Sequence, residues 1–530
     1  MLDLLIRGGT VIDGTGAPGF SADVAVEGGV IAAVEPLPPD TPARRVIHAA
    51  GKLVTPGFID IHRHADAAVF RPGFGELELR QGLTTIVNGN CGLSAAPFGA
   101  EHRDEILTYL APILGRAQTG LPTVRMADYL RALERERLPV NVGMLVGGGV
   151  VRADVSGYRA DPLDGARLRR IHQGLEQALA DGAFGVSLGL GYAPECFYST
   201  DGLIAALAPL AHTDIPVTVH MREEGSDVDK AVEEMLTVAR ALHCPLHISH
   251  LKAMGKRNWG RKIPAILNTL HRACEDGMDV RWDVYPYTAG STQLLHIMPP
   301  SLLRGGTNEI CRRLRDPAER RALREHLRTG TDFDNISLLV GWENIVMSSL
   351  RLPENRQYVG KTVAEVAALR GQEPEDCVFD LLADERCTIT MIDFIASEED
   401  IGAILRSDRV NVISDSTYPT EGVPHPRLYG TFARILEKYV RQDGVLTLPE
   451  AVHRMTDAPA QSLRIAGKGR IAVGYDADLL VFDPAAVHEA GTYADPARFA
   501  QGMRDVFVGG RPAILGGTRT DAASGVVLRR

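Results

Sequence analysis

Two histidines separated by a single residue end the apolar run Phe58-Ile-Asp-Ile-His62-Arg-His64. In a β-strand, side chains two positions apart share a face, so both imidazoles would point the same way. Imidazole nitrogen is the commonest protein metal ligand, and two rings that converge at a strand end indicate a divalent ion. The pair alone is a weak signal, so this prediction needs further ligands from elsewhere in the chain.

Four more residues of metal-binding type come at the ends of other apolar runs: Cys91, His220, His250 and Asp415. Thiolate, imidazole and carboxylate are the side-chain groups that bind zinc. Each of these positions is weak evidence by itself. Their common place at strand ends predicts a single metal site built around one axis.

Apolar strands and amphipathic helices alternate through the middle of the chain. We expect strands at residues 53–64, 84–90, 140–146, 184–190, 216–222, 246–252, 280–287 and 410–414. Amphipathic helical stretches separate most of them, for example residues 164–181, 227–242 and 263–276. Eight such strands predict an α/β fold with a closed (β/α)8 TIM barrel. Chemistry in such barrels lies at the carboxyl ends of the strands, where the candidate ligands stand.

Both ends of the chain have the pattern of short β-strands. Residues 2–34 contain apolar runs punctuated by glycine pairs, and residues 469–483 show the same pattern. Neither end has enough residues for an independent core, so the two should pair. We therefore expect a small β domain formed by residues 1–56 and 467–530, and a catalytic barrel formed by residues 57–466.

One connection is too long for a normal barrel crossover. About 120 residues separate the seventh and eighth predicted strands. Residues from about 290 to 345 are rich in arginine and leucine and predict an inserted helical segment. Residues 388–394 form an additional apolar run that could change the strand count.

Composition narrows the class of protein. The 530 residues are 45% hydrophobic and 23% charged, as in soluble globular proteins. A formal net charge of −10 argues against nucleic acid or an anionic membrane as a partner. The segment Met1–Arg7 has an apolar run shorter than a signal peptide requires, so we expect a cytoplasmic protein. The seven cysteines are scattered without a C-x-x-C pair, so neither a disulfide framework nor a structural zinc knuckle is expected.

Other residues near the candidate ligands have simpler interpretations. Strand alternation places His247 on the face opposite His250, toward the helices, so His243 and His247 are expected to pack or to lie at the surface. His425 lies on a loop near the expected barrel mouth and could order that loop. The glycines at 147–149 lack the G-x-G-x-x-G spacing, which favours a strand-to-loop turn over a nucleotide site.

Taken together, these residues resemble the amidohydrolase superfamily and, within it, the D-aminoacylase (N-acyl-D-amino-acid deacylase) family. The motifs are Pro56-Gly-Phe-Ile-Asp-Ile-His62-Arg-His64, Gly89-Asn-Cys91-Gly, Thr218-Val-His220-Met-Arg222, Ile248-Ser-His250-Leu-Lys252, Tyr285-Pro-Tyr-Thr-Ala-Gly-Ser291-Thr, Ser414-Asp415-Ser and His425-Pro-Arg-Leu-Tyr-Gly-Thr431. The resemblance covers essentially the whole chain. Many amidohydrolases bridge two metals with a lysine of strand four or a glutamate. The fourth predicted strand has neither, and the D-aminoacylases are similar in using the strand-two cysteine.

The resemblance implies zinc-dependent hydrolysis of a small-molecule N-acyl-D-amino acid to a carboxylate and a free D-amino acid. It implies a tightly bound zinc on Cys91, His220 and His250. It also implies a second, more weakly occupied position lined by His62 and His64 with Asp415. A thiolate and two imidazoles leave the fourth position of a zinc ion open for water, as a catalytic zinc requires.

The remaining expected site residues concern proton transfer and substrate binding. We expect Asp415 to take a proton from water and return it to the departing amide nitrogen. Lys252 and Arg222 each lie two residues after a ligand, where a cationic pair would hold an α-carboxylate, and the family implies a lysine at 252. The other residues that resemble family substrate contacts are Tyr192, Tyr285 and Ser291.

Two alternatives remain open at this point. One is another amidohydrolase activity, such as a D-residue dipeptidase or a cyclic amide hydrolase, although the missing strand-four lysine argues against the latter. The other is a non-catalytic scaffold homologue that serves as an interaction protein. The chain also departs from the family near Tyr192, with Val186-Ser-Leu-Gly189 and Pro194-Glu-Cys196, which leaves the pocket size and the preferred acyl group open.

Overall fold

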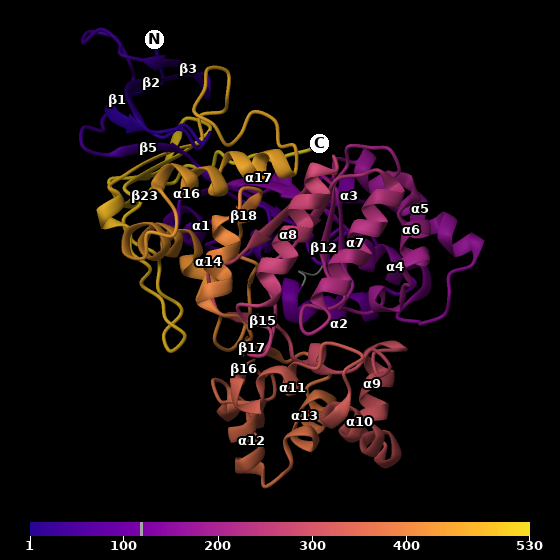
Figure 1. The fold of residues 1–530 in the computed structure, drawn as a ribbon. Helices are drawn as coiled ribbons and strands as arrows, with labels where there is room; N and C mark the ends of the chain where they lie inside the picture. The colour runs from indigo at the N-terminus through magenta and orange to yellow at the C-terminus, as the bar shows by residue number, and fades with distance from the viewer. Residues whose placement is uncertain (117–119) are drawn as a thin grey trace.

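Eight parallel strand positions form the centre of the molecule in a computed structural model that describes residues 1–116 and 120–530 (Figure 1). The positions are held by β6 (Phe58–Asp60), β8 (Leu83–Asn88), β9 (Asn141–Met144) with β10 (Val146–Gly147), β11 (Val186–Gly189), β12 (Val217–His220), β13 (Leu246–Ile248), β14 (Val280–Val284) and β18 (Val410–Val412). Backbone bonds close the ring, since the amide of Asp415 donates to the carbonyl of His62 (2.9 Å). The predicted α/β barrel is therefore confirmed.

Helices cover the outside of this barrel. They are α1 (Glu76–Arg80), α2 (Arg103–Leu114), α3 (Met126–Arg135), α4 (Gly148–Ser156), α5 (Gly165–Ala180), α6 (Thr200–Ala206), α7 (Val228–Leu242), α8 (Lys262–Glu275), α14 (Glu398–Arg406), α15 (Arg427–Arg434), α16 (Leu448–Met455) and α17 (Asp457–Ser462). Helix α5 shows why the prediction worked: Asp164 caps its first turn by accepting two backbone N–H groups, and Ile171 and Leu175 face the barrel. No helix in the described ranges is long and apolar enough to cross a membrane.

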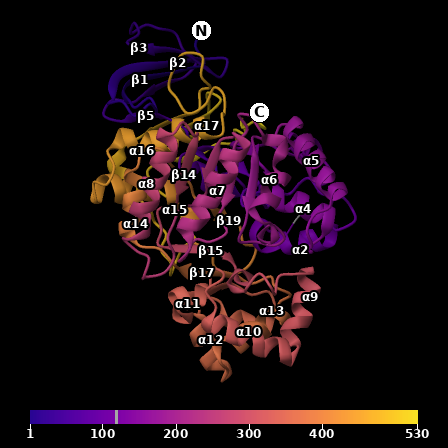
Figure 2. The same ribbon diagram turned by 45° about the vertical axis from the view of Figure 1, so that its right-hand side comes forward.

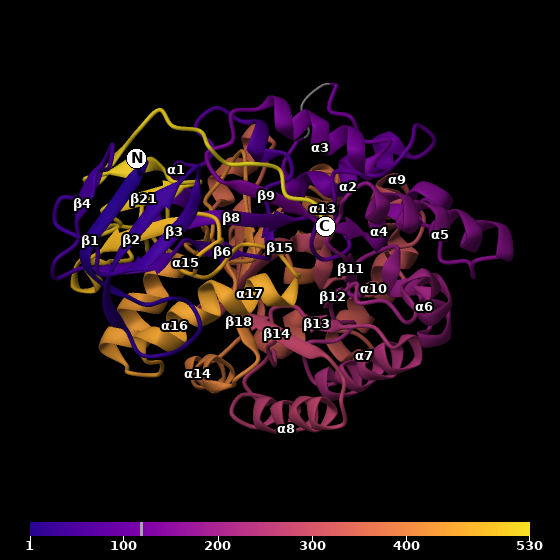
Figure 3. The same ribbon diagram turned by 90° about the horizontal axis from the view of Figure 1, so that it is seen from above.

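Strands from both ends of the chain form one nine-stranded sheet beside the barrel (Figure 3). Its members are β1 (Leu4–Val11), β2 (Phe20–Glu27), β3 (Val30–Glu35), β4 (Val46–His48), β5 (Leu53–Pro56), β20 (Leu479–Phe482), β21 (Asp505–Val508), β22 (Arg511–Leu515) and β23 (Thr518–Arg519). The two ends join where β5 pairs antiparallel with β20. The boundaries of a terminal β domain, 1–56 with 467–530, and of a barrel domain, 57–466, stay a prediction.

An insertion between β14 and β18 lies beyond one end of the barrel (Figures 1 and 2). Its strands β15 (Ala289–Gln293), β16 (Ile345–Ser349) and β17 (Thr390–Phe394) form a separate antiparallel sheet, so the apolar run at 388–394 does not change the barrel count. Its helices are α9 (Gly306–Arg315), α10 (Pro317–Thr329), α11 (Ile336–Val340), α12 (Val363–Arg370) and α13 (Pro374–Asp384). The expected end of the insertion near 345 was too early, because α12 and α13 share the apolar core of α9 and α10.

Candidate metal centre and substrate cavity

Three of the expected ligands converge at the carboxyl ends of barrel strands. Cys91 Sγ lies 3.6 Å from Nε2 of His250, and that nitrogen lies 3.1 Å from Nδ1 of His220. All three side chains are buried, and their ligand atoms lie within 4.8 Å of one another. A thiolate and two imidazoles at this spacing fit one zinc ion.

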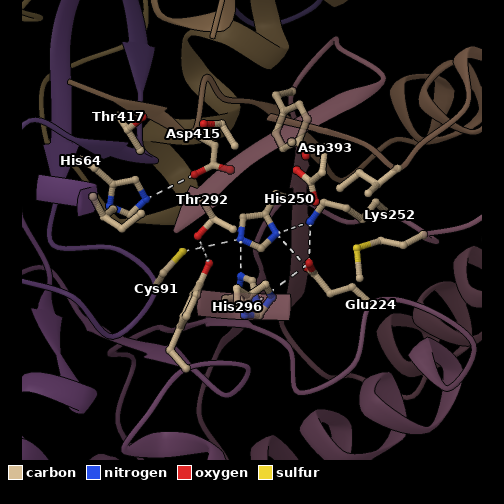
Figure 4. Close-up of a pocket in the computed structure, with 18 of the residues that line it drawn as sticks. His64, Cys91, Glu224, His250, Lys252, Thr292, His296, Asp393, Asp415 and Thr417 are labelled. Atoms are coloured by element: carbon tan, nitrogen blue, oxygen red, sulfur yellow. Dashed lines mark hydrogen bonds and ion pairs between the residues drawn. The ribbon is translucent and has the colours of Figure 1, made fainter. Parts of the chain in front are cut away.

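A second group of possible ligands shares the same thiol. Cys91 Sγ lies 3.2 Å from Nε2 of His62, and Oδ1 of Asp415 lies 3.4 Å from that nitrogen and 3.3 Å from Nε2 of His64. These four residues also bring their ligand atoms within 4.8 Å of one another. Figure 4 shows His64 and Asp415 above Cys91 in the view and His250 to its right. Cys91 thus lies between two adjoining metal-binding groups.

Left-handed backbone conformations aim three of these side chains into the site. The φ angles are 54° at Cys91, 37° at His250 and 50° at Asp415. Residues other than glycine adopt positive φ rarely and at a cost in free energy. Each of the three lies two or three residues after the end of a barrel strand, so the backbone turn there changes the direction of the side chain. Such strain is typical of functional sites.

The turn at His250 overturns one expectation. His247 was expected to face the helices because it lies an odd number of residues before His250. Leu246 and Ile248 instead pack among the outer helices, and His247 points inward, where its Nε2 lies 2.7 Å from Oδ2 of Asp283. Strand β13 ends at Ile248, so the alternation no longer applies at His250.

Asp283 supports the metal-binding groups from behind. Its Oδ1 accepts the backbone N–H of His250, and its Oδ2 lies 3.9 Å from Nδ1 of His62 as well as near His247. Carboxylates behind metal-binding histidines fix ring orientation and raise ligand basicity. Asp283 was not among the residues predicted from the sequence, although it stands near the end of the seventh barrel strand, β14.

A carboxylate and an amine flank the other face of His250. Glu224 Oε1 lies 2.9 Å from Nδ1 of His250, and Lys252 Nζ donates to Glu224 Oε2 (2.8 Å). With a carboxylate at Nδ1, the imidazole presents Nε2 to Cys91 and His220. Glu224 was not predicted from the sequence either. Its signal was its place four residues after His220, at the end of the same strand-to-loop segment.

Arg63, between the two histidines, fixes the end of the first barrel strand. It is fully buried and donates to Asp60 Oδ2 (3.0 Å), Glu78 Oε1 (3.1 Å) and the hydroxyl of Ser414 (3.1 Å). Burial tends to lower the pKa of Arg63, but Tyr418 and the two carboxylates outweigh it and raise that pKa further. The guanidinium therefore holds the first and last strand ends together.

The three glycines at 147–149 make room for the loop that carries Cys91. A Cβ at Gly147 would lie 2.4 Å from the carbonyl oxygen of Gly92, and one at Gly148 would lie 2.6 Å from Oε1 of Glu195. Glu195 Oε2 accepts the backbone N–H of Gly189 (2.7 Å). Burial raises the pKa of Glu195 to about 7. The strand-to-loop turn expected here is wrong, because β10 ends at Gly147 and α4 begins at Gly148, and the glycines instead allow close packing around a buried carboxyl.

The protonation states of the candidate ligands are compatible with binding of a metal cation. Burial holds the pKa of His62 and His220 well below 6.5, so both rings are neutral and can donate electron pairs. Burial and nearby carboxylates raise the pKa of the Cys91 thiol well above 9. Burial also raises the pKa of Asp415, but Arg427 at 2.9 Å and the histidines outweigh it and hold that pKa well below 3.8. A thiol that becomes a ligand here requires a metal ion to offset its charge.

A cavity opens in front of these groups and receives most of the expected substrate contacts. Its described lining includes the expected contacts Tyr192, Lys252, Tyr285 and Ser291. The Tyr192 ring packs against His220 at a tilt of 40°, with 4.6 Å between ring centroids, and its hydroxyl lies 2.8 Å from that of Thr292. His425 lies behind the cavity, where it accepts the backbone N–H of Arg427 and orders that loop.

Arg222 lies outside this cavity, contrary to the expected cationic pair with Lys252. Its guanidinium binds Glu234 (2.9 Å) and the carbonyl oxygens of Cys196 and Tyr198. Strand β12 ends at His220, so Arg222 no longer shares the face of the ligand. The structure therefore leaves Lys252 as the cation of the pair at the cavity.

Comparison with known proteins agrees with this geometry. A model described as "Amidohydrolase family" matches residues 45–514. The chain is 35% identical over 529 residues to D-aminoacylase of Alcaligenes xylosoxydans xylosoxydans, covering 100% of this chain and 98% of that enzyme. It is 34% identical over 522 residues to N-acyl-D-glutamate deacylase of the same organism, covering 96% and 93%.

A solved structure shows the same fold over its full length. It is the N-acyl-D-glutamate deacylase from Bordetella bronchiseptica complexed with zinc and a phosphonate inhibitor that mimics the tetrahedral intermediate. The TM-score is 0.84 at 32% identity, with 100% of both chains covered. The chain therefore belongs to the amidohydrolase family, in the group that contains D-aminoacylase and N-acyl-D-glutamate deacylase.

Proposed function

We propose that this protein is a zinc-dependent amidohydrolase that cleaves N-acyl-D-amino acids to a carboxylate and a free D-amino acid. The observation that carries the proposal is the meeting of two ligand groups at Cys91, in the wall of a cavity that Asp415 also lines. The full-length similarity to three D-amino-acid deacylases supports the same reaction. The substrate is a small molecule, and the negative charge of the chain argues against nucleic acid.

Zinc would be held in two unequal positions. Cys91, His220 and His250 would bind one ion tightly, because a thiolate and two neutral imidazoles are strong zinc ligands. His62, His64 and Asp415 would line the second, weaker position. When bound, zinc polarises an amide carbonyl and lowers the pKa of a coordinated water to about 7.

Asp415 is the residue that we assign to proton transfer. It lines the cavity, and Arg427 binds its Oδ2 at 2.9 Å, which leaves Oδ1 facing the two histidines. The carboxylate would accept a proton from the attacking water and donate it to the departing amide nitrogen. The nitrogen needs that proton because an amide anion is a poor leaving group.

The substrate would be oriented by hydrogen-bond donors in the cavity wall. Lys252 supplies the positive charge for the α-carboxylate, and Tyr285 and Ser291 supply neutral hydrogen bonds. Tyr192, whose ring packs against His220, lines the same cavity. When Lys252 holds the α-carboxylate of the substrate and the substrate amide lies at the metal ligands, the configuration at Cα decides which way the substrate side chain points.

The alternatives have weaker support. A cyclic amide hydrolase would be favoured by a strand-four lysine, and β11 (Val186–Gly189) contains none. A non-catalytic scaffold would not need the two ligand groups, Asp415 included, to be retained. A D-residue dipeptidase would differ only in the acyl group that it accepts. The substrate assay described next distinguishes it from a deacylase.

The test is an assay of zinc-loaded protein against matched pairs of N-acetyl-D and N-acetyl-L amino acids. Turnover of D-members with little or no turnover of their L-partners is the expected result. D-aminoacyl dipeptides tested alongside decide between a deacylase and a dipeptidase. Failure to cleave any D-member while zinc is bound would contradict the proposal.

A further inference from the structure

Acidic side chains outnumber basic ones in the described lining of the cavity. Three carboxylates line it, from Glu224, Asp393 and Asp415, whereas Lys252 is the one lysine or arginine in the described lining. Lys252 already binds Glu224 at 2.8 Å, and Arg427 neutralises Asp415 from behind at 2.9 Å. Asp393 is left without an ion pair in the described part of the chain.

Asp393 is buried and directed at the space beside the proposed substrate contacts. Its residue exposure is 2%, and its Oδ1 has no hydrogen-bond partner among the described residues. A Cβ at Gly290 on the neighbouring strand would lie 2.9 Å from this oxygen and 3.4 Å from the hydroxyl of Tyr285. Glycine at 290 therefore keeps open a small space between Asp393 and Tyr285. Figure 4 shows Asp393 beside Lys252 at the cavity.

Part of the cavity wall away from the ligands is apolar. Its buried apolar members are Leu93, Ile113, Met254, Ile336 and Ile395. An apolar substrate side chain gains free energy by leaving water for such a wall. A carboxylate there would lose its hydration without gaining a cationic partner.

We propose that the cavity accepts D-residues with neutral, apolar side chains and rejects acidic ones, and that Asp393 enforces the rejection by charge repulsion. This inference rests on the proposed deacylase function. The single cation Lys252 serves the α-carboxylate that every substrate carries, so a second carboxylate on the side chain meets Asp393 without compensation. Specificity of this kind comes from repulsion of the wrong ligand as much as from attraction of the right one.

The substrate panel of the wild-type protein is the first test. Because burial raises the pKa of Asp393 to about 6, assays at a pH of about 8 keep this carboxylate ionised. We expect kcat/KM for N-acetyl-D-methionine to exceed that for N-acetyl-D-glutamate by about 100-fold or more, since uncompensated like charges are strongly unfavourable. Equal or better turnover of the glutamate substrate overturns the inference.

Asp393→Asn tests the residue itself. The variant keeps the size of the side chain and removes its charge, so the ratio of kcat/KM for N-acetyl-D-glutamate to kcat/KM for N-acetyl-D-methionine should rise about 10-fold. Asp332→Asn is the matched control, because Asp332 is a surface residue of the insertion with its side chain 72% exposed. An unchanged ratio of the two substrates in Asp393→Asn removes Asp393 from this function.

Binding of the products separates this inference from the proposed reaction. Calorimetry with zinc-loaded wild-type protein should show tighter binding of D-methionine than of D-glutamate, whether or not any substrate turns over. Absence of turnover for every D-substrate contradicts the proposed function. Tighter binding of D-glutamate contradicts the inference.

Discussion

His247 Nε2 lies 2.7 Å from Oδ2 of Asp283 on the neighbouring barrel strand, and Oδ1 of Asp283 accepts the backbone N–H of His250. His247 belongs to neither ligand group, yet it positions the carboxylate that fixes the backbone of a proposed ligand. The left-handed conformation at His250 depends on such support, because it is unfavourable by itself.

Asp283→Ala should therefore weaken zinc binding. We expect the zinc affinity to fall about 10- to 100-fold, as when carboxylates behind metal ligands are removed elsewhere. Competition with a fluorescent chelator measures the affinity. Asp279→Ala is a suitable control, since Asp279 precedes the same strand and its side chain is 39% exposed. Equal zinc affinity in the two variants would show that Asp283 does not support the site.

Asp415→Ala should abolish most turnover while zinc remains bound. Loss of a general acid-base group costs about 100- to 10,000-fold in rate, and the three ligands of the tight position are untouched. The measurement combines kcat for N-acetyl-D-methionine with zinc content by metal analysis. A variant that keeps both zinc and near-normal turnover would show that proton transfer takes place elsewhere.

Lys252→Met should act on substrate binding. A charged hydrogen bond to a carboxylate contributes about 1.5–3 kcal/mol, so kcat/KM should fall about 10- to 100-fold. Methionine keeps the length and the apolar stem of the side chain. Zinc content must be measured alongside, because Lys252 also binds Glu224 beside His250. The proposed contact is refuted when KM for carboxylate-bearing substrates is unchanged in zinc-loaded protein.

Glu195→Gln should change the dependence of stability on pH. The pKa of Glu195 is raised from 4.5 to about 7, so the folded protein binds this proton more tightly than the unfolded chain does. That contribution is present below a pH of about 4.5 and is lost as the pH rises through about 7. Relative to the wild type, the variant should gain up to about 3 kcal/mol of unfolding free energy across this window.

Urea denaturation of both proteins at pH values of about 4.5, 6 and 8 measures this difference. Glutamine is neutral and can still accept the backbone N–H of Gly189, so the local packing is retained. A difference between the two proteins that does not vary with pH would show that Glu195 titrates normally.

The barrel and the ligands could be predicted because both depend on local pattern. Apolar runs, amphipathic helices and the Asp164 cap are properties of neighbouring residues, and barrel topology gathers the strand ends in one place. Its place at the end of an apolar run correctly placed His220 at the end of β12. Alternation was a poorer guide. It failed for His247, because a positive φ at His250 cannot be recognised from residue types.

The residues that hold the candidate ligands in place could not be predicted from the sequence for a different reason. Glu224, Asp283 and Arg427 act through contacts between residues far apart in the chain. Arg222 has the same spacing from its ligand as Lys252, but β12 ends before it and Glu234 binds it. The insertion was underestimated because α12 and α13 belong to it through packing with α9 and α10 rather than through composition.

The most direct test of the account is a zinc titration of metal-free protein with N-acetyl-D-methionine as substrate. Wild-type protein should be inactive without metal and regain activity as the tight position fills, whereas Cys91→Ala should bind zinc much more weakly and stay inactive at the same zinc concentration. Turnover by metal-free protein, or full recovery by Cys91→Ala, would contradict a hydrolase built around the zinc position of Cys91, His220 and His250.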